Sequence, residues 1–224
     1  GFGRLLFRSD VLNGGAGADV LKGLGGNDSL YGGGGNDLIY GGSGHDVLRG
    51  QGGIDTLHGE AGDDQLVWRL GDSSDRLDGG ADADWVQVQG DSRNNQLHVS
   101  QSSASELLVS DGVGTITIED SITRVVINAG AGRDTVTIGT VDRVPTVMLV
   151  VNGQGSGDTI DAAGRRRGAV RLFVDGGSDN APNTGRVEDH SPIGGDDAVV
   201  IRRFVRAHTI TGRPAAHSAH RRTS

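Results

Sequence analysis

The chain has 224 residues and a formal net charge of −8, and 40 of its residues are glycine. Glycine does not recur at every third position and only four residues are proline, which excludes a collagen-like chain. The lack of cysteine excludes disulfides, the excess of acidic residues argues against nucleic acid as a partner, and no apolar run is long enough to cross a membrane. Because aromatic residues make up only 4%, an ordinary globular core would be thin, and the composition favours a repeat architecture.

The first element along the chain is an array of nine-residue units at residues 14–67. Each unit has glycine at its first and fourth positions, aspartate at its sixth and leucine or isoleucine at its eighth. The six units read GGAGADVLK, GLGGNDSLY, GGGGNDLIY, GGSGHDVLR, GQGGIDTLH and GEAGDDQLV. Weaker copies flank them at residues 5–13 and 70–87, the second after a two-residue insertion of Trp68 and Arg69. A fixed period of this kind predicts a solenoid.

Each position of the unit has a physical interpretation. The glycines allow positive φ and close approach of neighbouring backbone, and the last three residues form a short strand whose eighth position points inward. So short a strand is not stable alone, and we expect strands of alternate units to stack into two parallel sheets, with one coil for every two units. The sixth-position aspartates then form one row of Asp19, Asp37 and Asp55 and another of Asp28, Asp46 and Asp64.

These rows of aspartates predict metal binding. Stacked strands lie roughly 4.8 Å apart, and like charges at that spacing repel unless a cation lies between them. Carboxylates and the carbonyl groups of glycine turns are the hard oxygen ligands that calcium prefers. For one isolated unit an aspartate that only caps its own turn would be the better interpretation, but six units in register favour calcium. Because few apolar side chains are available for burial, we expect the array to fold only as calcium binds.

The nonapeptide resembles the RTX, or haemolysin-type calcium-binding, repeat family, strongly over residues 14–67 and weakly over 5–13 and 70–87. This resemblance implies a right-handed parallel β-roll with calcium between stacked turns, held by sixth-position aspartate side chains and turn carbonyls. Carried over position by position, it implies as calcium ligands Asp19, Asp28, Asp37, Asp46, Asp55, Asp64 and Asp84. In the unit of Asp84 the fourth glycine is replaced by Asp82, which we expect to break the turn, and Asp75 is left out because its unit lacks the other glycines.

Beyond residue 87 the array ends but strand-forming segments continue. Alternating apolar residues predict seven strands, at 95–100, 106–110, 115–120, 124–128, 134–138, 147–152 and 170–175. Glycine-rich turns begin at residues 128, 152 and 175, which predicts a parallel β-helix with a longer coil. Asp134 and Asp158 match the sixth position of the nonapeptide and are further calcium candidates; the alternative is that they only cap their turns.

The sequence therefore predicts an all-β chain with three regions. An RTX nonapeptide β-roll, which is a two-sheet β-solenoid, occupies residues 1–87, and a divergent β-helix with longer coils occupies 88–180. A basic, poorly ordered tail is expected at 181–224, where the last 23 residues carry six arginines and no acidic residue. Residues 196–205 are the one expected strand of this tail, and the lack of an initiator methionine leads us to expect a piece of a longer protein.

The function expected from these features is calcium binding. The sequence contains no G-x-S-x-G, H-E-x-x-H or P-loop motif, so we expect no enzyme activity. We expect a module of a secreted, bacterial-type protein, outside the cell or on its surface, that folds on calcium binding after export, since extracellular calcium modules bind at roughly 10⁻⁴–10⁻³ M. Two alternatives remain: the C-terminal fragment of a secreted hydrolase, a protease or lipase, that lacks its catalytic domain, and a structural or adhesive stalk of a surface protein. Calcium is the one partner that the residues indicate.

Overall fold

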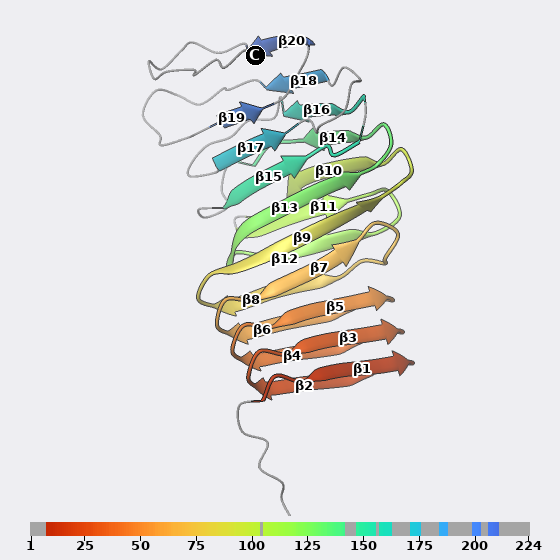
Figure 1. Cartoon of the computed structure of the whole chain (residues 1–224), viewed down its shortest axis with the longest axis vertical. Coiled ribbons are helices and arrows are strands. Elements are labelled where there is room, and N and C mark those ends of the chain that lie inside the picture. The colour runs from red at the N-terminus through yellow and green to blue at the C-terminus, as the bar shows by residue number, and fades with distance from the viewer. Residues whose placement is uncertain are drawn as a thin grey trace, which may run out of the picture.

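The computed structural model describes residues 8–103, 105–141, 147–155 and 157–162, and four further strands at 171–175, 184–187, 199–202 and 206–210. These residues form strands and turns and no helix, and therefore no helix that is long and apolar enough to cross a membrane. The strands make two sheets, of nine and eleven strands, that face each other in a β-solenoid (Figure 1). The all-β class and the two-sheet solenoid are thus confirmed.

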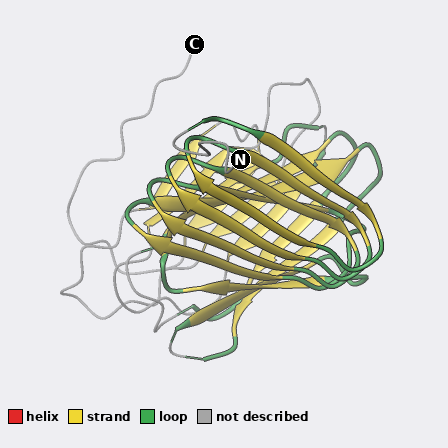
Figure 2. Cartoon of the chain, turned by 90° about the horizontal axis from the view of Figure 1, so that it is seen from below, coloured by secondary structure: helices red, strands yellow, loops and turns green. Residues whose placement is uncertain are grey.

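The nine-stranded sheet is parallel throughout. Within the array, strands that are adjacent in this sheet come from every second nine-residue unit. Its strands, in spatial order, are β1 (Val11–Ala16), β3 (Ser29–Gly34), β5 (Val47–Gly52), β7 (Gln65–Arg69), β9 (Asp84–Asp91), β13 (Ile122–Gly130), β15 (Met148–Asn152), β17 (Arg171–Asp175) and β19 (Val199–Arg202). Figure 2 looks along the stack and shows the turns gathered along the two edges of the coils.

The eleven-stranded sheet is parallel except at one place. Its strands, in spatial order, are β2 (Val20–Gly25), β4 (Leu38–Ser43), β6 (Thr56–Ala61), β8 (Arg76–Ala81), β12 (Thr115–Glu119), β11 (Glu106–Ser110), β10 (Gln96–Gln101), β14 (Thr135–Ile138), β16 (Thr159–Ala162), β18 (Thr184–Val187) and β20 (Arg206–Ile210). The strand β11 runs antiparallel to both β10 and β12. Three strands therefore lie between β8 and β14 in this sheet, whereas β9 pairs directly with β13 in the other.

The downstream region continues as the expected parallel β-helix, but two antiparallel pairs interrupt one of its sheets at β11. All seven expected strands are present, but the connections on either side of β11 are only a few residues long, and so short a connection joins antiparallel strands only. The turn from β11 to β12 is closed by Asp111, whose Oδ1 accepts hydrogen bonds from the backbone N–H groups of Val113 at 2.8 Å and Gly114 at 2.7 Å. Local turn chemistry thus adds two extra strands to one sheet.

The core is a narrow layer of apolar side chains between the two sheets. In the array the register pairs each unit with the next but one, so Leu30 lies beside Leu48 and Leu21 beside Ile39. The eighth-position side chains are all buried, namely Leu21, Leu30, Ile39, Leu48, Leu57, Leu66, Leu77 and Val86. The inserted Trp68 is also fully buried and lengthens its coil, so that Leu66 pairs with Val86. The expected boundary at residue 87 falls inside β9, and both sheets run on without a break.

The region expected to be a poorly ordered tail contains three strands. The expected strand at 196–205 overlaps β19, and β18 pairs in parallel with β16 on one side and with β20 on the other. The other residues of 181–224 lie outside the described part of the chain, so the poorly ordered tail stays a prediction.

Candidate metal centre

The structure places the sixth-position aspartates in two rows, each aspartate lying at the start of its strand. The first row precedes strands of the nine-stranded sheet and consists of Asp10, Asp28, Asp46, Asp64 and Asp84. The second row precedes strands of the eleven-stranded sheet and consists of Asp19, Asp37, Asp55 and Asp75. The expected separation of neighbouring aspartates into alternate rows is therefore observed.

Two members of these rows were missed by the expected ligand set. Asp10 belongs to a weak unit ahead of the array, and Asp75 belongs to a unit without the usual glycines. The sequence signal for Asp75 is its spacing to Leu77. In the intact units too, the aspartate stands two residues before a buried leucine or isoleucine. The two-residue insertion before it only lengthens the coil, since Asp55 still bonds to Asp75 as Asp37 bonds to Asp55.

After the first aspartate of each row, one carboxylate oxygen of every aspartate is satisfied by the coil before it. Oδ1 accepts the backbone N–H of the aspartate one coil earlier in the same row, at N–O distances between 2.7 and 2.9 Å. Hydrogen bonds of this kind favour the ionised carboxylate and fix its orientation. These hydrogen bonds do not involve the second carboxylate oxygen, Oδ2.

The second carboxylate oxygen is buried and accepts no hydrogen bond. This is so for Oδ2 of Asp19, Asp28, Asp37, Asp46, Asp55, Asp64 and Asp84. Leaving a buried polar atom unpaired costs about 1–3 kcal/mol, and more when the group is charged. A row of such atoms within one fold indicates that a positively charged partner belongs there.

The first-position glycines show what lies beside these oxygens. A Cβ atom built on Gly14 would lie 2.8 Å from Oδ2 of Asp19 and 2.6 Å from the carbonyl oxygen of Gly32, one coil further on. The same two oxygens crowd the corresponding position of Gly23, Gly32, Gly41 and Gly59. The first glycine is therefore required for space, because a carboxylate oxygen and a carbonyl oxygen converge there with no proton donor between them. Two converging hard oxygens are the donor set that calcium binds.

The second position of the unit has a different requirement, which is a positive φ. Glycine usually provides it, but Leu24, Gln51 and Glu60 adopt φ of 74°, 69° and 77° at this position. Asp82, at the fourth position of its unit, likewise has φ of 81°. The expectation that Asp82 breaks its turn is therefore wrong: aspartate tolerates the left-handed region better than most residues, and Asp84 keeps its place in the first row.

Burial makes these carboxylates resist ionisation. Desolvation raises the pKa of Asp64 to about 7, of Asp75 to about 8 and of Asp84 to about 6. Backbone N–H groups oppose this shift, and the negative charges of neighbouring aspartates add to it. The pKa values of Asp46 and Asp55 are raised for the same reasons. A bound cation would act in the opposite direction and lower these pKa values.

The remaining ligands of such a cation must come from the backbone. Within the described residues no three side chains of histidine, cysteine, aspartate or glutamate gather around one point. Calcium commonly takes six to eight oxygen ligands, and backbone carbonyls are among them. The donor set of these rows, buried carboxylates beside the backbone carbonyls of first-position glycines, therefore fits calcium better than a metal that prefers side-chain nitrogen or sulfur.

Asp134 and Asp158 stack in a third row together with Asn95. The N–H of Asn95 donates to Oδ1 of Asp134 at 2.7 Å, and the N–H of Asp134 donates to Oδ1 of Asp158 at 2.9 Å. Sequence reasoning missed Asn95, although it stands two residues before the buried Leu97, as the aspartates stand before their leucines.

The first two rows end at apolar residues. Ile122 is the register partner of Asp84, and because Thr117 pairs with Arg76, Ile116 stands beside Asp75. Both isoleucines are buried. The third row begins at Asn95, just before β10, and is thus separated from the second by the strands β12 and β11.

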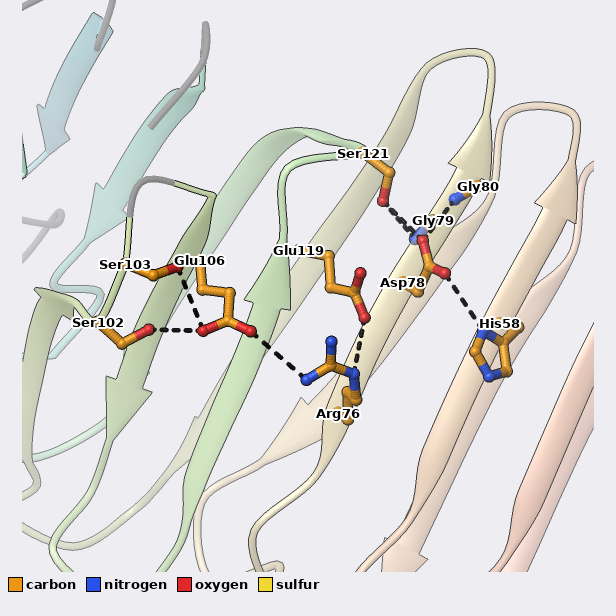
Figure 3. A network of polar contacts seen from close by, with 10 residues as sticks. All are labelled: His58, Arg76, Asp78, Gly79, Gly80, Ser102, Ser103, Glu106, Glu119 and Ser121. Atoms are coloured by element: carbon orange, nitrogen blue, oxygen red, sulfur yellow. Dashed lines mark hydrogen bonds and ion pairs between the residues drawn. The ribbon is translucent and has the colours of Figure 1, made fainter. Parts of the chain in front are cut away.

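A serine, an aspartate and a histidine also meet on the outer face of the eleven-stranded sheet (Figure 3). Oγ of Ser121 donates to Oδ1 of Asp78 at 3.0 Å, and Nδ1 of His58 lies 3.3 Å from Oδ2 of the same aspartate. The aspartate is therefore in the middle, whereas a catalytic triad places the histidine between the serine and the acid. The expectation that the chain has no catalytic site stays a prediction.

Comparison with known proteins agrees with the geometry of the rows. A family model described as RTX calcium-binding nonapeptide repeat, in four copies, matches residues 7–39, 40–67 and 69–92. No curated protein matches the chain. The matched residues cover the whole of the first two rows, including Asp10 and Asp75. The resemblance to the RTX calcium-binding nonapeptide repeat is therefore confirmed over residues 7–92.

Proposed function

We propose that the chain is a non-catalytic calcium-binding module whose nonapeptide array completes its fold when calcium ions bind between successive coils. The observation that carries this proposal is the set of buried Oδ2 atoms without a hydrogen-bond donor, each beside a first-position glycine. When bound, calcium supplies the positive charge that offsets the burial and mutual repulsion of these carboxylates.

In this proposal, different oxygen atoms of the array have different roles in holding the ions. Oδ2 of Asp19 and the carbonyl of Gly32 form one oxygen pair in the second row, and Oδ2 of Asp28 and the carbonyl of Gly41 form the equivalent pair in the first row. The Oδ1 atoms orient the carboxylates through the backbone N–H bonds between coils. Each ion would therefore join two adjacent coils, so that binding and stacking reinforce each other.

We place this module in a secreted protein. A fold that depends on calcium stays incomplete where calcium is scarce, inside the cell, and forms where calcium is plentiful, outside it. Extracellular calcium modules bind at roughly 10⁻⁴–10⁻³ M, which suits such a change. The same module would serve a secreted hydrolase or a surface stalk.

The proposal is tested by calcium titration of the whole chain, followed by circular dichroism and by the number of ions bound. We expect strand content to rise with calcium in the wild type. Asp37→Ala with Asp55→Ala should bind fewer ions and require more calcium for half-maximal folding. A matched control, Glu60→Ala with Asp120→Ala, removes the same charge from exposed positions and should behave as the wild type. Equal strand content in calcium and in chelator would contradict the proposal.

A further inference from the structure

Asn95 stands where an aspartate stands in the array, and its side chain has a different partner. It is 8% exposed, and its N–H donates to Asp134 as the aspartate N–H groups do along their rows. Its Nδ2 donates a hydrogen bond to the carbonyl oxygen of Ala129 at 3.0 Å. Ala129 lies five residues before Asp134, as Gly32 lies five residues before Asp37, and is therefore the first position of its unit.

The contact of Asn95 is the one that the aspartates of the array cannot make. In the array, Oδ2 of the sixth residue and the first-position carbonyl of the next coil are both acceptors, and they converge without a proton. At Asn95 one of the two groups is an N–H donor, so the same pair forms a direct hydrogen bond. The amide proton of Asn95 thus joins the side chain to the carbonyl of the next coil, whereas a carboxylate would need a cation between the two oxygens.

The next coil of the third row returns to a carboxylate. Asp134 is fully buried; its Oδ1 accepts the N–H of Asn95, and its Oδ2 is buried without a hydrogen-bond partner. The register that pairs Asn128 with Asn152 places Gly153 one coil above Ala129. Asp134 therefore lies one coil before Gly153 and Asp158. Asn95 lies in the same way one coil before Ala129 and Asp134.

We propose that the coil of Asn95 is an ion-free step, in which the asparagine amide takes the place of a calcium ion, and that the gap between Asp134 and the coil of Gly153 and Asp158 holds one further calcium ion. This site lies outside the residues that match the repeat family, 7–92. The inference rests on the proposed function, because it gives the buried, unpaired Oδ2 of Asp134 the role proposed for the Oδ2 atoms of the array.

One difference from the array sets the expected strength of this site. A Cβ at the first position of an array unit would lie less than 3.0 Å from Oδ2 of its own aspartate, yet Ala129 carries a Cβ at that position. The carboxylate of Asp134 must therefore be displaced from the arrangement of the array. We expect the further ion to bind more weakly than the ions of the first two rows.

Two reciprocal variants of the whole chain test the inference, with the number of calcium ions measured by native mass spectrometry and folding by circular dichroism. Asn95→Asp removes the donor and should bind one ion more than the wild type. Asp134→Asn supplies a donor and should bind one ion fewer, with wild-type strand content at saturating calcium. Asp120→Asn, a change of the same kind at an exposed position, should leave the number of ions unchanged.

The outcomes separate this inference from the proposed function. An unchanged number of ions in Asn95→Asp would overturn the amide step, and an unchanged number in Asp134→Asn would overturn the further site. If Asp134→Asn does not fold, Asn95→Asp still decides whether the amide replaces an ion. A wild-type chain that binds no calcium would instead overturn the proposed function, and this inference with it.

Discussion

The array at residues 14–67 and the wider coils at 84–162 are stabilised in different ways, although the same two sheets run through both. In the array each strand contributes one inward apolar side chain, and its next inward position is the first glycine of the following unit, as Leu48 and Gly50 show in β5. In the wider coils that second position is apolar, as Val86 and Val88 show in β9. Each buried aliphatic side chain contributes roughly 1.5–3 kcal/mol. The wider coils therefore have a core that the array lacks.

The change between the two regions begins at Trp68. This side chain is fully buried, donates its Nε1–H to the carbonyl of Ser73 at 3.0 Å, and begins a second inward row that continues through Val88, Ile127 and Val151. Over the same stretch the first and second rows of aspartates end. The wider coils therefore gain buried apolar area that the array does not have, and under the proposed function the array relies on calcium instead.

Removal of calcium should break the molecule along this division and have the largest effect. When a chelator replaces saturating calcium, we expect the amides of β1 to β6 to lose hydrogen-exchange protection by about 100-fold or more, since several unpaired carboxylate oxygens would each cost about 1–3 kcal/mol. The amides of β9, β13 and β15 should keep most of their protection, because their strands have two inward apolar residues. The measurement is hydrogen exchange followed by mass spectrometry. An equal loss of hydrogen-exchange protection in β1 to β6 and in β9, β13 and β15 would contradict the difference between the two regions.

Acid should partly replace calcium in the array. The pKa values of Asp64, Asp75 and Asp84 are raised to about 7, 8 and 6, above the value of about 3.9 in an unfolded chain. The folded state thus binds protons more tightly than the unfolded state, and its stability is fully present below about pH 4 and is lost as pH rises through 6 to 8.

Because these pKa values are raised in the folded state, stability without calcium and affinity for calcium should depend on pH in opposite directions. In calcium-depleted buffer, strand content and the urea midpoint should be higher at pH 5 than at pH 8. In limiting calcium, affinity should instead fall from pH 8 to pH 5, because protons compete for the same oxygens. Asp64→Asn with Asp75→Asn should flatten the first dependence. A midpoint that rises with pH in the absence of calcium would show that burial of these carboxylates is not the controlling effect.

The smallest expected effect concerns the second position of the unit. Gln51 holds φ of 69°, in a region that costs a residue with a Cβ roughly 1–2 kcal/mol. Gln51→Gly should therefore raise the free energy of unfolding in saturating calcium by about 0.5–1 kcal/mol, after the entropy cost of glycine is subtracted. The matched reverse change, Gly42→Gln, should lower it, since a Cβ there would meet the carbonyl of Leu24. Both are measured by urea unfolding, and a Gln51→Gly variant less stable than the wild type would refute the strain.

Much of the array was predictable because its order is local and repeated. A period of nine implies that alternate units stack, and the structure separates Asp37 from Asp46 as expected. Asp75 and Asn95 were not assigned because each lies in a coil whose length or composition departs from the repeat, so only the hydrogen bonds between coils reveal their places. The direction of β11 also escaped prediction, since alternating apolar residues do not distinguish parallel from antiparallel neighbours.

Stacked short strands with aspartates in rows follow from the sequence alone, because glycine, aspartate and leucine recur at fixed intervals and each has a local conformational or packing reason. Which oxygens are left without a donor and which are satisfied follows from the packing of one coil on the next. That distinction depends on contacts between residues about 18 to 39 positions apart, such as Asp37 with Asp55 and Asn95 with Asp134. An aspartate and an asparagine occupy equivalent places in these coils, and each faces a carbonyl of the next coil: the asparagine amide donates a hydrogen bond to it, whereas the aspartate Oδ2 is left without a donor.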